Sequence, residues 1–170
     1  MNTPAPAPSG KPFRLTRVFE APRALVWAAW TKPEHLQGWL GPKGFTMPRC
    51  TIDLRPGGIF HYCMRSPEGH EGWGKWTFLE IVPPEKLVAI VSFSDAQGGV
   101  TRHPMSPQWP LETLSTVTFA EKAGRTTLTI EWSAHNASEA ERKTFDDSHP
   151  NMTLGWGGTM DQLAAHLARA

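Results

Sequence analysis

The sequence has few of the features that mark secreted, membrane-spanning or disulfide-stabilised proteins. It contains only two cysteines among 170 residues, too few for a disulfide framework. No apolar stretch approaches the length of about 20 residues that a transmembrane helix needs. The opening residues, MNTPAPAPSGKP, lack the apolar centre of a signal peptide. We therefore expect a cytoplasmic protein with reduced thiols and no membrane insertion.

A charge excess is missing as well. The chain carries 17 Lys and Arg against 16 Asp and Glu, a formal net charge of +1, and its positive residues form no long block. Proteins that bind nucleic acids or anionic membranes concentrate positive charge on one surface. The sequence therefore predicts no nucleic acid among its partners.

Signatures of cofactor chemistry are also absent from the sequence. None of the seven histidines has a histidine four residues away, and no Cys-x-x-Cys pair occurs, so a zinc site is not expected. There is no phosphate loop, dinucleotide fingerprint or nucleophile elbow. We accordingly assign no metal, no cofactor and no catalytic residue. General acids and bases remain available, and the candidates are Asp53, His61, Glu80, Asp95, Glu131 and Asp161.

What the chain does have are the residue patterns of strands and helices, in a length that fits one domain. Residues 1–12 are rich in Pro and Ala and predict a disordered tail, and residues 13–170 predict a single domain. Phe13–Glu20 alternates like a strand. Residues 21–40 read as two short helices, with Pro22 and Pro33 suited to their first positions.

The middle of the chain predicts antiparallel strands. Turn residues at Arg55–Gly58 (RPGG), Pro83–Lys86 (PPEK) and Lys122–Arg125 (KAGR) indicate three hairpins between Thr46 and Trp132. Residues 94–110 are rich in Gly, Pro and Ser and predict an irregular loop. Within this loop, Asp95–Pro110 is expected to be the most mobile internal segment and to act as a lid over a binding site.

The C-terminal part predicts helix. Ser138 followed by Glu141 indicates a capping box, and Pro150 suits the start of the last helix. In that helix Trp156, Met160, Leu163 and Leu167 share one stripe. The order of elements predicts an α+β helix-grip fold, in which a curved antiparallel sheet wraps around a long C-terminal helix. A gap between sheet and helix is a common place for a small molecule.

Eight tryptophans are the most unusual feature of the composition. Phe60, Tyr62 and Met64 alternate with polar neighbours and point to one side of a strand, and Trp76 and Phe78 share a face of the next. Either these side chains pack a solid core, or they line a ligand cavity beneath the last helix. The cavity hypothesis takes as candidate ligand-binding residues Phe60, Tyr62, Met64, Trp76, Phe78, Trp109, Trp156 and Met160, with Trp109 as a gate.

Three glycines, Gly155, Gly157 and Gly158, stand where the last helix is expected to begin. Each costs about 1 kcal/mol relative to Ala inside a helix. The helix could begin after them, or they could allow close packing on the sheet. Alternatively, their missing side chains leave room for a ligand.

Several motifs together are similar to a known family. APRALVWAAWTKPEHLQGWLGP (21–42), DLRPGGIFHYCM (53–64), EIVPPEKLV (80–88) and GWGGTMDQLAAHLA (155–168) resemble the START-like SRPBCC superfamily. The branch they resemble is that of the bacterial homologues of the C-terminal domain of the heat shock protein 90 ATPase activator. The resemblance implies a helix-grip fold. It leaves function open, because the superfamily contains lipid carriers, hormone receptors, polyketide cyclases and chaperone regulators.

Three functions follow as hypotheses. The first is binding of a hydrophobic or aromatic small molecule without catalysis, oriented by polar groups such as Tyr62 and His61. The second is a cyclase or hydrolase that uses the same cavity, with a His or carboxylate as general base. The third is a regulatory interaction with a chaperone ATPase through an exposed apolar patch. A homodimer is compatible with each.

The two cysteines give a test of strand register. If RPGG is a four-residue hairpin loop, Leu54 lies opposite Ile59, and Cys50 lies opposite Cys63. An oxidised pair would then be sterically allowed. We expect free thiols, and we expect Phe60, Tyr62 and Met64 on the opposite face from both cysteines. A bulge would shift this register by one residue.

Overall fold

The strand and helix patterns fold into one antiparallel sheet and four helices in the computed structural model, which describes residues 11–169. Most of the expected N-terminal tail, residues 1–10, lies outside the described residues. The elements run in the order β1 (Phe13–Phe19), α1 (Arg23–Thr31), α2 (Pro33–Trp39), β2 (Thr46–Ile52), β3 (Ile59–Arg65), β4 (Glu71–Val82), β5 (Lys86–Ser94), β6 (Val100–Thr101), β7 (Glu112–Lys122), β8 (Arg125–His135), α3 (Glu139–Asp147) and α4 (His149–Arg169).

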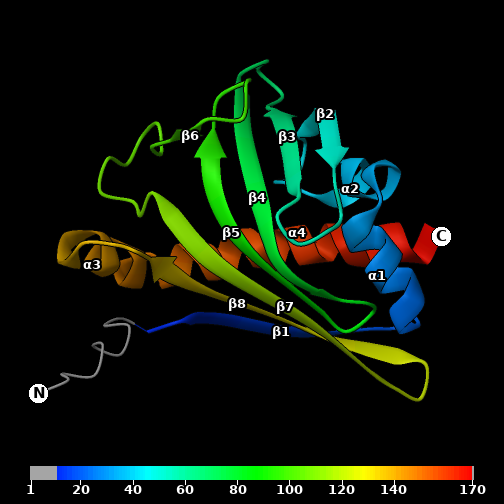
Figure 1. Ribbon diagram of the computed structural model, residues 1–170. Helices are drawn as coiled ribbons and strands as arrows, with labels where there is room; N and C mark the ends of the chain where they lie inside the picture. The colour runs from blue at the N-terminus through cyan, green and yellow to red at the C-terminus, as the bar shows by residue number, and fades with distance from the viewer. Residues whose placement is uncertain (1–10, 170) are drawn as a thin grey trace, which may run out of the picture.

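The sheet is curved, and α4 runs across its concave face (Figure 1). Its strand order is β1-β8-β7-β5-β4-β3-β2, with the short β6 added to β5. All pairs are antiparallel. Hairpins join β2 to β3, β4 to β5 and β7 to β8. The helices α1 and α2 lie at one end of α4, and α3 lies at the other (Figure 1). The predicted α+β helix-grip fold is confirmed.

Local sequence signals explain where these elements begin. Ser138 accepts a hydrogen bond from the Glu141 N–H while the Glu141 carboxylate accepts one from the Ser138 N–H, which is the predicted capping box at the start of α3. Pro33 is the first residue of α2, and Pro22 precedes α1 as its N-cap. The predicted irregular loop contains one short strand, β6, because Val100 and Thr101 pair with the end of β5.

The packed core lies between the sheet, the two short helices and the second half of α4. Trp30 and Leu36 come from α1 and α2, and Met160, Leu163 and Leu167 come from α4. All five are at most 7% exposed. They cover Phe78, Leu87, Val117, Phe119 and Ile130 on the sheet. Burial of each large apolar side chain contributes about 1.5–3 kcal/mol to the free energy of folding. Because these buried side chains gather at this end of the molecule, most of the packed core lies here.

The predicted pairing of the cysteines is wrong by one residue. Cys50 pairs with Tyr62, and Arg49 pairs with Cys63. The loop between β2 and β3 is one residue longer than assumed, since the Asp53 N–H donates to the Ile59 carbonyl. Because side chains alternate along a strand, this shift places the two thiols on opposite faces of the sheet. Cys50 therefore shares the face of Tyr62, and both thiols are free.

The glycines of the last helix have a clear setting. The helix begins at His149, before all three glycines, so it does not start after them. A methyl group added at Gly155, Gly157 or Gly158 would meet no atom within 4 Å. Close packing on the sheet is therefore not their role, and open space lies beside each. Among residues 11–169, no helix is long and apolar enough to cross a membrane.

Candidate functional site

The inner face of β4 changes character along its length. Its successive inward residues are Gly72, Gly74, Trp76 and Phe78. The first three pair with Met64, Tyr62 and Phe60 on β3, and Phe78 exchanges backbone hydrogen bonds with the β2–β3 loop at Gly57 and Gly58. Trp76 and Phe78 are 4% and 2% exposed and fill the core. Neither glycine has a side chain: the Tyr62 ring lies over Gly74, and the space beside Gly72 is open. The sheet is therefore hollow at the end of β4 where the glycines lie.

The tryptophan between the two glycines points the other way. Trp73 stacks its ring on His61 with centroids 4.9 Å apart. The His61 Nε2 lies 3.1 Å from the Ser94 hydroxyl and 3.0 Å from the Asp95 carbonyl oxygen. His61 is thus committed to the outer face, and the expectation that it would orient a ligand beside Tyr62 is corrected.

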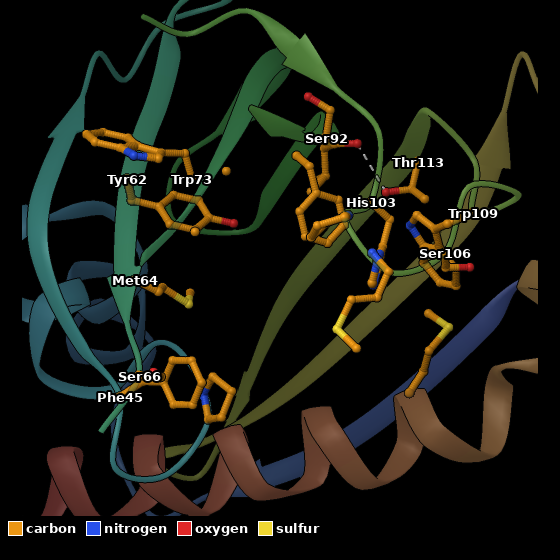
Figure 2. Close-up of a pocket in the computed structure, with 18 of the residues that line it drawn as sticks. Phe45, Tyr62, Met64, Ser66, Trp73, Ser92, His103, Ser106, Trp109 and Thr113 are labelled. Atoms are coloured by element: carbon orange, nitrogen blue, oxygen red, sulfur yellow. Dashed lines mark hydrogen bonds between the residues drawn. The ribbon is translucent and has the colours of Figure 1, made fainter. Parts of the chain in front are cut away.

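A cavity of about 870 Å³ occupies the hollow end. Figure 2 shows Tyr62 and Met64 on one side of it, facing His103, Ser106 and Trp109 on the other. Its wall is mainly aromatic and thioether, and includes Phe45, Tyr62, Met64, Phe93, Met105, Trp109, Trp132 and Met152. The Thr113 hydroxyl, also in the wall, is held by the Val91 carbonyl at 3.4 Å.

A smaller cavity of about 290 Å³ lies beside it, against α4. It shares Tyr62, Met64, Trp132 and Met152 with the larger one. Gly155 forms part of its wall, so the absent side chain of this glycine contributes to the space. The two cavities form neighbouring lobes that meet at these shared side chains.

The segment between β6 and β7 closes the larger lobe on the side away from β3. Arg102 donates to the Glu141 carboxylate at 2.5 Å and thereby ties the segment to the capping box of α3. The Trp109 ring packs on Phe145 at 5.5 Å, and His103 packs on Phe93 at 4.7 Å. Met105, at its tip, is 87% exposed. This segment is the later part of the predicted lid, Asp95–Pro110, whose mobility and role as a lid stay predictions.

The eight residues expected to bind ligand separate into two groups. Tyr62, Met64 and Trp109 line the larger cavity, while Trp76 and Trp156 line the smaller one together with Tyr62 and Met64. Phe60, Phe78 and Met160 are at most 2% exposed and lie in the packed core. They are packed among the other apolar side chains of the core and line neither cavity.

Sequence reasoning missed much of the wall. Phe45, Phe93, His103, Trp132 and Met152 line the larger cavity and were not among the candidates. Most of them belong to loops or to the ends of strands, where periodicity gives no direction for a side chain. The available signal was the pair Gly72 and Gly74, since inward glycines in a strand indicate missing volume.

Burial controls the charge state of groups in and near the cavity. It raises the pKa of Tyr62 to about 12, because the phenolate is poorly solvated beside the other rings. It lowers the pKa of His103, so the imidazole favours its neutral form. It also raises the pKa of Cys50 to about 11 and raises that of Cys63. Neutral hydrogen-bonding groups therefore predominate, and neither thiol is an activated nucleophile.

Within residues 11–169, no three His, Cys, Asp or Glu side chains lie close enough together to hold a metal ion. The candidate acids and bases are also dispersed. Arg55 binds Asp53, Lys86 binds Glu80, Arg14 binds Glu131 and Arg17 binds Asp161. The Asp95 carboxylate accepts from the Gln97 and Gly99 N–H groups of its own turn. These carboxylates serve surface ion pairs and a turn.

Known structures share this arrangement. A protein from Nitrosomonas europaea is 28% identical, with a TM-score of 0.71 over 93% of this chain and 94% of that one. A protein from Arthrobacter aurescens is 27% identical, with a TM-score of 0.74 over 94% and 87%. The AHSA1 protein from Silicibacter pomeroyi, at 20% identity, matches in fold with a TM-score of 0.69 over 93% and 98%.

No protein with curated function matches the chain. The sequence profile of the activator of Hsp90 ATPase homolog 1-like proteins matches residues 20–168. That match includes both short helices, the turns of all three hairpins and the terminal helix. The chain belongs to the activator of Hsp90 ATPase homolog 1-like family, a START-like branch of the SRPBCC superfamily.

Proposed function

We propose that the protein binds a hydrophobic or aromatic small molecule in the larger cavity. The observation that carries this proposal is the combination of a volume of about 870 Å³ with a wall of aromatic rings and methionines. Binding pockets for small molecules commonly span about 300–1,000 Å³ and place a few polar groups in apolar walls. Here the polar groups include the Tyr62 and Ser106 hydroxyls, the His103 imidazole and, near the turn between β3 and β4, the carboxylates of Glu68 and Glu71.

The wall supports a ligand with flat apolar surfaces. Burial of 100 Å² of apolar ligand area is worth about 2.5 kcal/mol. Rings from Tyr62, Phe93, Trp109 and Trp132 offer faces and edges for aromatic contacts. Met64 and Met152 add flexible, polarisable side chains that adapt to ligand shape. These properties favour an aromatic ligand over a purely polar one.

The other two functions have less support. A cyclase or hydrolase needs an activated base or nucleophile in the cavity, whereas the thiols are protonated and Tyr62 titrates near 12. A chaperone-directed role, which the family's name suggests, calls for a continuous apolar surface. Of the exposed large apolar side chains, Phe45, Phe93 and Met105 line the larger cavity and are therefore part of the small-molecule site. Others, such as Val18 on β1, Leu79 on β4 and Leu154 on α4, come from separate elements.

The proposal is tested by filling the cavity. Gly72 lines it, and a Cβ atom added there meets no atom within 4 Å. We expect Gly72→Leu to fold and to bind 2-naphthalenemethanol at least about tenfold more weakly than the wild-type protein, measured by isothermal titration calorimetry. Native mass spectrometry of freshly purified protein is expected to show a retained small molecule in the wild type and a reduced amount in the variant.

Gly157→Leu is the matched control. This glycine also has open space around it, but it lines neither cavity. We expect the control to bind the probe like the wild type. Equal affinity of wild type and Gly72→Leu, or no binding of the probe to the wild type, would contradict the proposal.

A further inference from the structure

We propose that the polar end of the ligand is a basic nitrogen, so that the cavity selects an aromatic cation over an aromatic carboxylate or phosphate. This inference rests on the proposed function and specifies the ligand class for the same site. It follows from the charged groups at the cavity wall and from the kind of rings beside them.

The charges at the wall are of one sign. The lining side chains include Glu68 and Glu71, and no Lys or Arg among the residues that the structure describes there. A carboxylate or phosphate taken into the cavity would therefore lose its hydration without gaining an ammonium or guanidinium partner. An unpaired buried charge carries a large desolvation penalty. An acidic ligand is disfavoured for this reason.

The arginines near the mouth are already occupied. Arg65 binds the Glu71 carboxylate at 3.0 Å, and Arg102 binds Glu141 at 2.5 Å. Lys43 occupies an exposed position between the lining residues Pro42 and Phe45 and is not itself part of the wall. Glu71 is balanced by Arg65, which leaves Glu68 as the wall carboxylate that takes part in no ion pair within residues 11–169.

Glu68 belongs to the turn between β3 and β4, at the glycine-rich end of β4. Its side chain is exposed, so its attraction for a cation is screened by water and salt and is modest. The aromatic wall adds to it. A cation placed against the face of a Trp, Tyr or Phe ring gains further stabilisation, and Phe45, Tyr62, Phe93 and Trp109 all line the cavity.

One part of the wall acts in the opposite direction. The start of α4, where Ser148 and Asn151 line the cavity, is a helix N-terminus, and its dipole favours negative charge. Pro150 removes one N–H donor from this turn. The helix N-terminus favours a negatively charged ligand and Glu68 favours a positively charged one. An experiment that varies only the charge of the ligand therefore shows which of the two dominates.

The experiment uses three probes of similar size that share the naphthalene ring: 2-(aminomethyl)naphthalene, 2-naphthalenemethanol and 2-naphthoate. Isothermal titration calorimetry at neutral pH and low salt gives each dissociation constant. We expect the amine to bind about threefold to tenfold tighter than the alcohol, as expected for a screened ion pair with cation–π contacts. We expect the carboxylate to bind at least about tenfold more weakly than the alcohol.

Glu68→Gln separates charge from shape. The variant is expected to lose most of the amine's advantage and to keep the affinity for the alcohol. Glu34→Gln, which removes an exposed carboxylate that lines neither cavity, is the matched control and is expected to leave all three affinities unchanged. Thermal unfolding of each variant checks that the fold is retained.

The outcomes distinguish the two proposals. If none of the three probes binds, the proposed function itself fails. If the alcohol binds but the carboxylate binds as tightly as the amine or tighter, the ligand class assigned here is overturned and the start of α4 is the dominant electrostatic feature. An amine preference that is undiminished in Glu68→Gln would also overturn the role assigned to this carboxylate.

Discussion

The two halves of β4 have the same strand geometry but different surroundings: one half packs in the core and the other borders the larger cavity. In one half the inward residues are Trp76 and Phe78, both buried against α1 and α4. In the other they are Gly72 and Gly74, and a cavity of about 870 Å³ lies above them. The helix that covers the sheet changes in parallel: its second half buries Met160, Leu163 and Leu167, whereas its first half contains the three glycines. The packed core and the larger cavity thus lie at opposite ends of β4.

The largest effect expected from this contrast is on unfolding. Phe78→Ala should lower the free energy of unfolding by about 3–5 kcal/mol, because it leaves a void in packed surroundings. Met64→Ala, at the cavity end, should cost less than about 2 kcal/mol, since its side chain already borders open space. Urea unfolding measures both. Similar losses of unfolding free energy for the two variants would contradict the contrast between a packed half and a cavity half of β4.

The second prediction concerns the only tyrosine of the chain. Absorbance at 295 nm should show Tyr62 ionising near 12 in the folded protein and near its ordinary pKa of 10.0 in urea. Because the folded pKa is the raised one, the stabilising contribution is complete below pH 10.0 and is lost as the pH rises toward 12. A folded midpoint near 10 would show that the cavity end is well hydrated.

The third prediction separates the two glycines of β4. A methyl group at Gly74 would lie 2.5 Å from the Tyr62 hydroxyl oxygen, whereas one at Gly72 meets nothing within 4 Å. Gly74→Ala should therefore cost about 1–3 kcal/mol in stability, and Gly72→Ala should change it by less than about 0.5 kcal/mol.

A double variant tests the cause of this difference. If the clash with Tyr62 is responsible, Gly74→Ala should cost much less in a Tyr62→Ala background than in the wild type. The two substitutions would then show a coupling energy above about 0.5 kcal/mol. Additive effects in denaturant titrations would contradict the close approach of the ring to Gly74.

The smallest effect is expected in α4, at a glycine that lines neither cavity. Gly157→Ala should raise the free energy of unfolding by about 0.5–1 kcal/mol, because alanine favours the helix and the added methyl group meets no neighbour. Thermal unfolding of wild type and variant measures it. Destabilisation would indicate that this glycine serves the packing of the helix after all.

The sequence was sufficient for much of the fold. Turn residues located three hairpins, and Ser138 with Glu141 located the start of α3, because these signals act over a few neighbouring residues. The β2–β3 register was not predictable in the same way. One extra residue in the loop at Asp53–Gly58 reverses which side chains face inward, and turn residues alone do not define loop length to one residue.

The candidate site was harder to predict than the fold. Attention to large rings selected Phe60 and Phe78, which fill the core, because a strand pattern shows the face of a residue but not what lies above it. The cavity depends on side chains that are missing at Gly72 and Gly74. Its far wall, with His103 and Trp109, comes from an irregular segment in which no periodicity indicates direction.

The tryptophans described above also form an optical network. Trp132 lies in the cavity wall with its ring 5.5 Å from that of Trp156, which in turn stacks on Trp30 at 6.2 Å. Trp30 continues to Trp39 at 4.9 Å and Trp76 at 6.2 Å. Indole rings at such separations transfer excitation energy to one another. A quencher bound against Trp132 is therefore expected to reduce the fluorescence of the tryptophans in the core as well. Binding of a quenching ligand in the cavity can therefore be followed by intrinsic tryptophan fluorescence, without a label.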